Sequence, residues 1–257
     1  MELHSGREIG EIWGYTTVGL ARTDEEMQQH LATLPNGGQD ALGSDWRAGD
    51  IMYADLNGDG YISSGSERLG DTGDLSVIGN TTPRFLFGLD LNASWKGFDL
   101  RAFFQGVMKR DIWNGGVFTF GATGGVMWQA TGIEAVSDYF RNENTWSVQE
   151  GYMDANTDAY LPRPLYSNKN LQTQTRYLQN AAYIRLKNLQ IGYTIPATIT
   201  QRWGISNLRI FFSGENLWTA SGVDKQYDPE TLTGGYEGEG IGYPLQKTLS
   251  FGLNITL

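Results

Sequence analysis

Five segments of this chain alternate between apolar and polar side chains, and this pattern restricts the possible folds more than any other feature. The segments are residues 84–95, 98–106, 183–195, 208–216 and 248–257. A period of two places successive side chains on opposite faces of a β-strand. The sequence therefore predicts antiparallel strands that each have one apolar face and one polar face.

Shorter signals refine this prediction. Lys96-Gly97 separates the first two strands and predicts a tight hairpin turn. The parity of the third strand changes near Asn188, which predicts a β-bulge. Ile9–Leu20 alternates less regularly and forms a weaker sixth strand.

Two helices are expected inside the connections. The first is expected over Arg22–Leu34. Thr23 would cap its N-terminus, and Glu26 follows three residues later, which is the pattern of a capping box. Residues 131–143 place apolar side chains on one side of a helix. Both helices would be local structure within long loops.

Strand length and loop length together favour a membrane barrel over a soluble sandwich. A tilted strand needs roughly 9–11 residues to cross a bilayer, whereas strands of soluble proteins average about 5–6. Bacterial barrels join such strands by short periplasmic turns and long extracellular loops. The sequence thus predicts an all-β fold, a segment of a large antiparallel transmembrane β-barrel with about 5–6 strands. Its extracellular loops would cover residues 21–82, 108–176 and 218–244.

Composition excludes several classes of function. The 257 residues carry 19 basic and 29 acidic side chains, a formal charge of −10, so nucleic acid is not an expected partner. The chain has no cysteine, no long apolar run and no leader-like pattern after Met1. Its two histidines lie far from the acidic loops, and no serine elbow is present. We therefore identify no catalytic residue and expect no enzymatic activity.

The stretch "DLNGDGYIS", Asp55 to Ser63, follows the first half of an EF-hand calcium loop. Asp55, Asn57 and Asp59 supply oxygen ligands at alternate positions, and the Tyr61 carbonyl would add another. The twelfth position, where an EF-hand has an acid, is Ser66. The two interpretations are a structural calcium site and an Asx-rich turn that holds no metal.

Side chains on the strands and loops admit more than one role. Trp95, Trp203 and Trp218 lie at strand ends or beside turns, where aromatic girdles of barrels lie. Aromatic residues of the long loop either form a small core of their own or stack on a sugar: Trp113, Trp128, Trp146, Tyr152, Tyr160 and Tyr166. A polar barrel interior is predicted from Asp90, Asp99, Arg101, Gln105, Arg185, Lys187, Arg209 and Glu215. Substrate-binding residues are not identified.

Six stretches, in order, resemble the SusC/RagA class of TonB-dependent outer-membrane transporters from Bacteroidetes. They are "IGEIWGYTTVGLARTDEEM", "GDIMYADLNGDGYIS", "GDLSVIGNTTPRFLFGLDLNASWKGFDLRAFFQG", "AAYIRLKNLQIGYTIP", "LRIFFSGENLWT" and "DPE". Such transporters are several times longer and carry an N-terminal plug. The chain is therefore expected to be their C-terminal portion without the plug, as a fragment, a split gene product or a piece of a larger assembly.

The resemblance also implies a function and partners. The intact protein would import oligosaccharides or peptides across the outer membrane, with a SusD-like surface lipoprotein as a lid over the extracellular loops. TonB–ExbB–ExbD would supply energy through the plug. In shorter versions of the acidic loop in this family, an acid at the twelfth position leads into the next strand. That role would fall to Asp74 here, with Glu67 and Asp71 as alternatives.

A competing hypothesis is a soluble, calcium-dependent β-sandwich module that binds carbohydrate. It would share the aromatic residues, the acidic charge and the calcium loop. A sandwich would remain in aqueous buffer, whereas a barrel segment would need detergent.

Overall fold

The structure is a computed structural model that describes residues 7–66, 68, 70–113, 115, 137–232 and 243–257. The chain divides into two compact units. The sheet unit comprises residues 83–110, 180–232 and 242–257, and the loop unit comprises residues 1–82, 111–179 and 233–241. The loop unit thus contains most of the two longest predicted connections.

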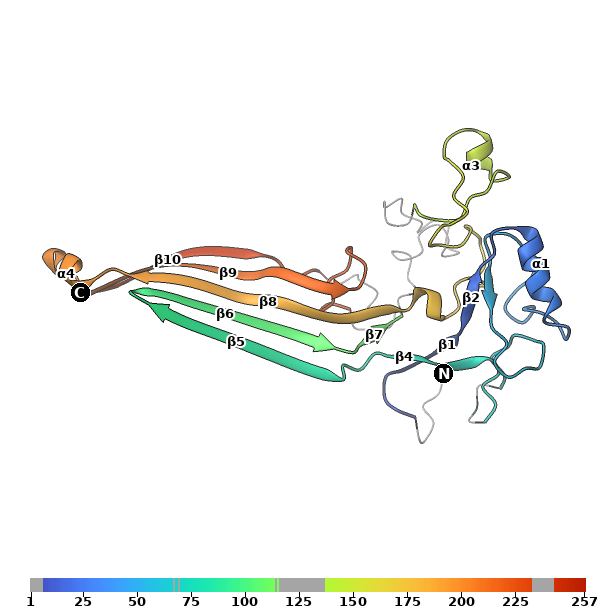
Figure 1. Cartoon of the computed structure of the whole chain (residues 1–257), viewed down its shortest axis with the longest axis horizontal. Helices are drawn as coiled ribbons and strands as arrows, with labels where there is room; N and C mark the ends of the chain where they lie inside the picture. Colours follow the sequence, from blue (N-terminus) through green and yellow to red (C-terminus); the bar gives the residue numbers. More distant parts are fainter. Residues whose placement is uncertain (1–6, 67, 69, 114, 116–136, 233–242) are drawn as a thin grey trace. The chain divides into compact units, whose positions relative to one another are not determined.

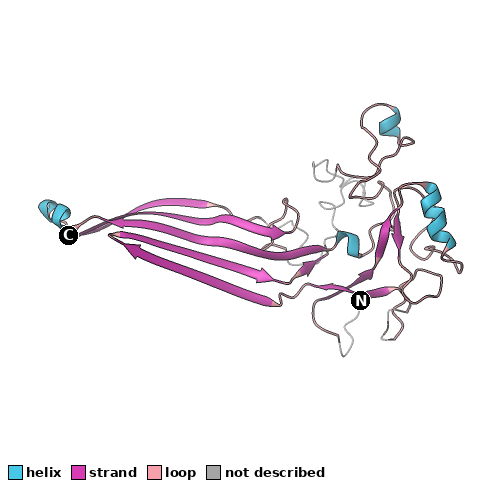
Figure 2. Cartoon of the chain, viewed as in Figure 1, coloured by secondary structure: helices cyan, strands magenta, loops and turns pink. Residues whose placement is uncertain are grey.

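Five long antiparallel strands form the sheet unit (Figures 1 and 2). They are β5 (Phe85–Trp95), β6 (Phe98–Met108), β8 (Gln179–Thr194), β9 (Asn207–Gly222) and β10 (Thr248–Thr256). Their order across the sheet is β10-β9-β8-β6-β5. All five predicted strands are confirmed, and β9 runs further than predicted, to Gly222. The short α4 (Ala197–Thr200) and η5 (Gln201–Trp203) lie between β8 and β9.

The pairing register keeps the two faces of the sheet distinct. One row across all five strands is apolar: Ala93, Leu100, Ile191, Phe212 and Phe251. The neighbouring row on the opposite face is polar: Asn92, Arg101, Gln190, Ser213 and Ser250. Directly paired residues place their side chains on the same face. The predicted alternation is therefore confirmed in three dimensions.

Two local features of the sheet are also confirmed. Lys96 and Gly97 have φ values of 46° and 88°, as both central residues of a type I′ hairpin turn require. The register of β8 shifts between Leu186 and Asn188 against both neighbouring strands, which is the predicted bulge.

The loop unit contains short elements around a separate core. Its elements are β1 (Glu11–Tyr15), β2 (Thr17–Leu20), α1 (Asp24–Ala32), β3 (Ile51–Tyr53), β4 (Leu75–Asn80), β7 (Asp111–Ile112), α3 (Trp146–Gln149) and η4 (Thr175–Tyr177). Strand β1 pairs with β4, and β2 pairs with β3. The predicted sixth strand, Ile9–Leu20, therefore forms strands but pairs in two small sheets and not in the long one.

The first predicted helix is confirmed as α1. The Thr23 hydroxyl accepts a hydrogen bond from the Glu26 backbone N–H at 3.2 Å. The Glu26 carboxylate in turn accepts one from the Arg22 N–H at 2.7 Å. Within the described residues, no helix is both long enough and apolar enough to cross a membrane.

The second predicted helix is wrong where the structure describes it. Residues 131–136 lie outside the described residues, but Tyr139 bridges to Leu161 and Arg141 bridges to Asn156. The buried Arg141 guanidinium donates to backbone carbonyls, including that of Asp154 at 3.1 Å. These tertiary contacts hold the segment extended and override its helical pattern.

A buried carboxylate joins two distant segments of the loop unit. Asp50 is fully buried, and its oxygens accept hydrogen bonds at 2.8 Å from Arg163, Lys169 and Asn170. The Arg47 backbone N–H donates to the same carboxylate at 3.0 Å. Burial by itself would raise the pKa of Asp50, but the hydrogen bonds from Arg163, Asn170 and Lys169 outweigh it and lower that pKa.

We predict that Asp50→Asn weakens the loop unit locally, because it leaves the buried Lys169 and the partly buried Arg163 without their counter-charge. The expected loss is about 3–5 kcal/mol in the opening free energy of the Ile51–Tyr53 amides. Hydrogen exchange followed by mass spectrometry measures this loss. Because the pKa of Asp50 is lower in the folded state, its stabilisation is complete above pH about 4 and disappears as pH falls through the lowered value. Asp50→Asn should remove that acid dependence.

Asp45→Asn is the matched control. Asp45 pairs with Arg47 on the surface, and both side chains are exposed, so the expected loss is at most about 1 kcal/mol. Equal loss of protection in the two variants would contradict the role of the buried carboxylate.

Candidate functional site

The predicted metal ligands lie in one tight loop after β3. The two Asp55 oxygens accept backbone N–H groups of Gly58 at 2.6 Å and Gly60 at 2.8 Å. Asp59 accepts the Tyr61 N–H at 2.8 Å and the Asn57 side-chain amide at 2.9 Å. Asn57, in turn, accepts the Asp59 N–H at 2.9 Å. The side chains of Asp55, Asn57 and Asp59 thus stabilise the turns of the loop by hydrogen bonds.

Of the two described acids that are candidates for closing this loop, Asp74 returns to it and Asp71 does not. Asp74 is fully buried, and its two oxygens accept the N–H groups of Leu56 and Ser63, both at 2.8 Å. Its own N–H donates to the Ser63 carbonyl at 2.9 Å. Asp71 instead accepts the Ser66 N–H at 3.1 Å. Glu67 lies outside the described residues.

Two glycines lie side by side at this neck, where residues 64–73 leave and rejoin the loop. Gly65 and Gly73 have φ values of 58° and 54°, in the left-handed region. A Cβ on Gly65 would lie 2.5 Å from the Gly73 nitrogen, and one on Gly73 would lie 2.3 Å from the Ser63 oxygen. Both positions therefore require glycine.

The donor types of the loop fit a hard cation, because all are oxygens. However, within the described residues no three His, Cys, Asp or Glu side chains gather so that they could hold a metal ion. The carboxylate oxygens already accept hydrogen bonds from backbone amides of the loop, although each oxygen has a second lone pair. Calcium binding by Asp55, Asn57, Asp59, Tyr61 and Asp74 stays a prediction.

We predict that Asp74→Asn loosens the neck. An asparagine side chain offers only one acceptor atom, so one N–H, of Leu56 or Ser63, would lose its charge-assisted bond to this buried side chain, at a cost of about 1–3 kcal/mol. Hydrogen exchange of the segment 56–63 should accelerate accordingly. Asp71→Asn is the control, because Asp71 is exposed and binds only residues within the excursion. The same acceleration in both variants would show that the neck does not depend on Asp74.

On the polar face of the sheet, predicted interior residues pair with one another. Arg101 donates to Asp90 at 2.8 Å, and Arg209 donates to Asp99 at 2.9 Å. The second pair spans β8 at Gly192, where a Cβ would lie 2.5 Å from atoms of both side chains. Glycine at this position therefore allows the pair to form across the intervening strand.

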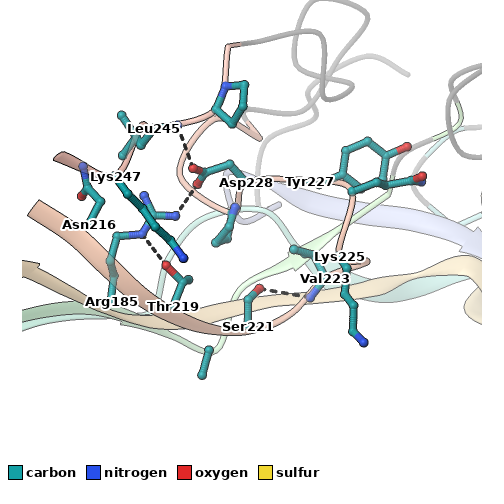
Figure 3. Close-up of a pocket in the computed structure, with 14 residues that line it drawn as sticks. Arg185, Asn216, Thr219, Ser221, Val223, Lys225, Tyr227, Asp228, Leu245 and Lys247 are labelled. Atoms are coloured by element: carbon teal, nitrogen blue, oxygen red, sulfur yellow. Dashed lines mark hydrogen bonds and ion pairs between the residues drawn. The ribbon is translucent and has the colours of Figure 1, made fainter. Parts of the chain in front are cut away.

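Two more of the predicted interior residues, Arg185 and Lys187, belong to a largely buried polar cluster, which we call the Arg185 cluster. Its members are Arg185, Lys187, Thr219, Asp228 and Glu230. Arg185 is buried and donates to the Thr219 hydroxyl at 2.8 Å and to Asp228 at 2.7 Å (Figure 3). Lys187 donates to Glu230 at 2.9 Å. These bonds fasten the loop that follows β9 onto β8.

Two of the five residues of this cluster are predictable from the alternation in the sequence. The alternation identifies Arg185 and Lys187, whereas "DPE" stands out only as a family motif. The two cations on β8 match the two carboxylates Asp228 and Glu230 in number. This match predicts the ion pairs only when the path of the loop after β9 is known. Asp228 is held in place because its second oxygen accepts the Leu245 N–H at 3.0 Å.

A pocket of about 590 Å³ lies beside the Arg185 cluster within the sheet unit (Figure 3). Arg185, Asp228, Lys225 and Lys247 supply its charged lining. Its apolar lining includes Val223 and Leu245, and residues of β9 and of the segments 226–229 and 244–245 form the rest of the wall.

The loop aromatics divide between the two interpretations. Trp113 and Tyr160 pack on the buried Tyr177, at centroid distances of 6.5 and 5.3 Å. Trp113 therefore belongs to the loop core, whereas Tyr160 lies at its edge and leaves 40% of its surface exposed. Trp146 and Tyr152 lie exposed and contact each other at 5.4 Å. Tyr166 is also exposed, and Trp128 lies outside the described residues.

The sequence of the chain is similar to sequences of known receptors. The chain is 28% identical to TonB-dependent receptor P3 of Formosa agariphila over 98% of its own length and 22% of that receptor. It is 27% identical to TonB-dependent receptor P26 of the same organism, over 81% of the chain and 20% of the receptor. The chain is a homologue of TonB-dependent receptors. It spans about a fifth of the length of these relatives.

The fold of this receptor homologue is also found among solved structures. A RagAB peptide transporter superimposes with a TM-score of 0.59 at 18% identity, over 96% of this chain and 23% of the transporter chain. No protein-family model matches. The resemblance to the SusC/RagA class, first seen in the motifs, is confirmed.

Proposed function

We propose that the chain is part of an outer-membrane TonB-dependent importer of oligosaccharides or peptides. The observation that supports this best is the division of the long sheet into an exposed apolar face and a polar face. Phe251, in the middle of β10, leaves 85% of its surface exposed on the apolar face. Such a band belongs against lipid, and the opposite face then lines the polar interior of a barrel.

Three further features support the same proposal. Trp95, Trp203 and Trp218 are exposed, as residues of an interfacial girdle would be. The relatives are receptors and the structural neighbour is a peptide transporter, which supports a role that is not enzymatic. A sandwich would need a second large sheet over the apolar face, whereas the other sheets of the described chain have two strands each. The soluble module is therefore not favoured.

The partners follow from the proposed import cycle. Residues 21–82, 108–176 and 218–244 would lie outside the cell, where a SusD-like lipoprotein closes over them. The proton-motive force would act through TonB–ExbB–ExbD on a plug elsewhere in the protein. The similarity to a peptide transporter supports a peptide substrate, and the exposed Trp146–Tyr152 pair supports a sugar by stacking.

We propose further that calcium binds the loop of Asp55, Asn57 and Asp59 as a structural clip closed by Asp74. Calcium would then stabilise the folded loop by binding to that form only. Calorimetric titration should show heat for the native sequence and none for Asp59→Ala. No heat in either protein leaves the hydrogen-bonded turn as the correct description.

Membrane insertion can be tested with two neighbouring residues of β5. Leu91→Arg places a charge on the apolar face near the middle of the strand, at an expected cost of about 2–4 kcal/mol in lipid. Asn92→Arg places the same charge on the polar face and should cost less than about 1 kcal/mol. Urea unfolding of the complete protein from lipid vesicles measures both. Equal costs would contradict the assignment of the two faces.

Uptake tests the function itself. Deleting the gene that encodes the chain should abolish growth on the imported oligosaccharide or peptide but not on its monomers. Loss of TonB should produce the same pattern. Unchanged growth on all oligomers tested would contradict nutrient import.

A further inference from the structure

The tip of the loop formed by residues 137–161 presents two aromatic rings to solvent. Trp146 leaves 67% of its surface exposed, and Tyr152 leaves 71%. The ring centroids lie 5.4 Å apart, and the ring planes are tilted by 39°. Figure 1 shows α3, which carries Trp146, at the end of this loop. Most of the surface of both rings is therefore open to a ligand.

The backbone fixes the two rings relative to each other. Gly151 follows the end of α3 with a φ of 72°, in the left-handed region, and its N–H donates to the Val148 carbonyl at 3.0 Å. The Tyr152 N–H donates to the Ser147 carbonyl at 2.9 Å. These two bonds form a Schellman motif, in which an apolar contact commonly joins the residue after the glycine to the helix. The motif explains why Trp146 and Tyr152 touch, but not why both rings stay exposed.

Hydrogen bonds close the base of the loop. The buried Arg141 guanidinium donates to the Ser137 carbonyl at 2.8 Å and to the Asp154 carbonyl at 3.1 Å. Arg141 and Asn156 also exchange two backbone hydrogen bonds, at 3.0 and 2.7 Å. The tip is thus held from below, and a ligand that stacks on the rings would order little further chain. Such pre-organisation favours binding because less conformational entropy is lost.

Exposed polar side chains flank the two rings along the chain. They are Glu143, Asn144, Gln149 and Glu150. Among the described residues, none of these four side chains has a hydrogen bond or ion pair. Carboxylate and amide oxygens accept hydrogen bonds from hydroxyl groups, and the amide nitrogens also donate. The tip therefore combines an apolar surface with free polar groups on either side of it in the sequence.

We propose that this tip binds a neutral oligosaccharide. The C–H groups of its sugar rings pack on Trp146 and Tyr152, and its hydroxyl groups bond to the flanking carboxylates and amides. A hydroxyl group can replace the water around Glu143 and Glu150, whereas the apolar surface of a protein partner would desolvate them. An anionic membrane surface would repel the same two charges. The proposal rests on the proposed import function and names the residues that capture the substrate.

Binding can be measured without any import step. Isothermal titration uses the intact protein that carries this chain, purified in detergent. The sugar probes are maltohexaose, cellohexaose, xylohexaose and mannohexaose, and a tryptic digest of casein is the peptide probe. Because no transport takes place in this experiment, failure of binding is distinguishable from failure of nutrient import.

We expect at least one hexasaccharide to bind saturably. Trp146→Ala and Tyr152→Ala should each weaken that sugar by about tenfold, because a stacked ring is lost. Trp146→Phe keeps a ring and should bind within about threefold of the native sequence. Tyr166→Ala is the matched control, since Tyr166 is an exposed aromatic residue of the same long predicted connection. It should change the affinity by less than about twofold.

Hydrogen exchange of residues 147–153 shows whether each variant keeps the loop folded. Trp146→Phe retains the apolar contact with Tyr152 and should keep the native exchange rates, so its affinity reports stacking alone. The proposal is overturned if no hexasaccharide binds or if only the casein peptides bind. It is also overturned if Tyr166→Ala weakens the sugar as much as Trp146→Ala does.

Discussion

The pairing register of the five long strands is the constraint on which the sheet unit depends. A slip of one residue between any two strands would move apolar side chains to the polar face along the whole strand. The hydrogen-bond ladder alone does not forbid such a slip, but the solvent on each face does. The bulge in β8 shifts the register within this constraint, and polar residues pair with polar residues again beyond it.

How far the sequence predicts this structure depends on the range of the interaction. Alternation, the Lys96-Gly97 turn and the Thr23 cap are local, and all three are readable from neighbouring residues. The contact between Asp50 and Arg163 joins residues 113 apart in the sequence. No local pattern marks such a partner, because a buried aspartate needs only some cation and the chain has many. The extended conformation at Arg141 escapes prediction for the same reason.

The pocket shows the same division between what is local and what is not. Alternation places Arg185 on the polar face, but its partner Asp228 lies 43 residues away in an irregular loop. The acidic loop is conspicuous in the sequence because its oxygen ligands are close together along the chain. In three dimensions those oxygens accept hydrogen bonds from backbone amides. Spacing along the chain thus identifies donor types well and their partners poorly.

The neck at Asp74 makes the acidic loop independent of the length of chain it carries. Two hydrogen bonds join Ser63 and Asp74. The segment between these two residues can therefore change in length or sequence as long as Gly65 and Gly73 are kept. Lengthening a flexible loop is cheap, roughly 0.6 kcal/mol for each doubling. Residues 66–72 are therefore a natural place to graft an epitope or a fluorescent label without disturbing the fold on either side.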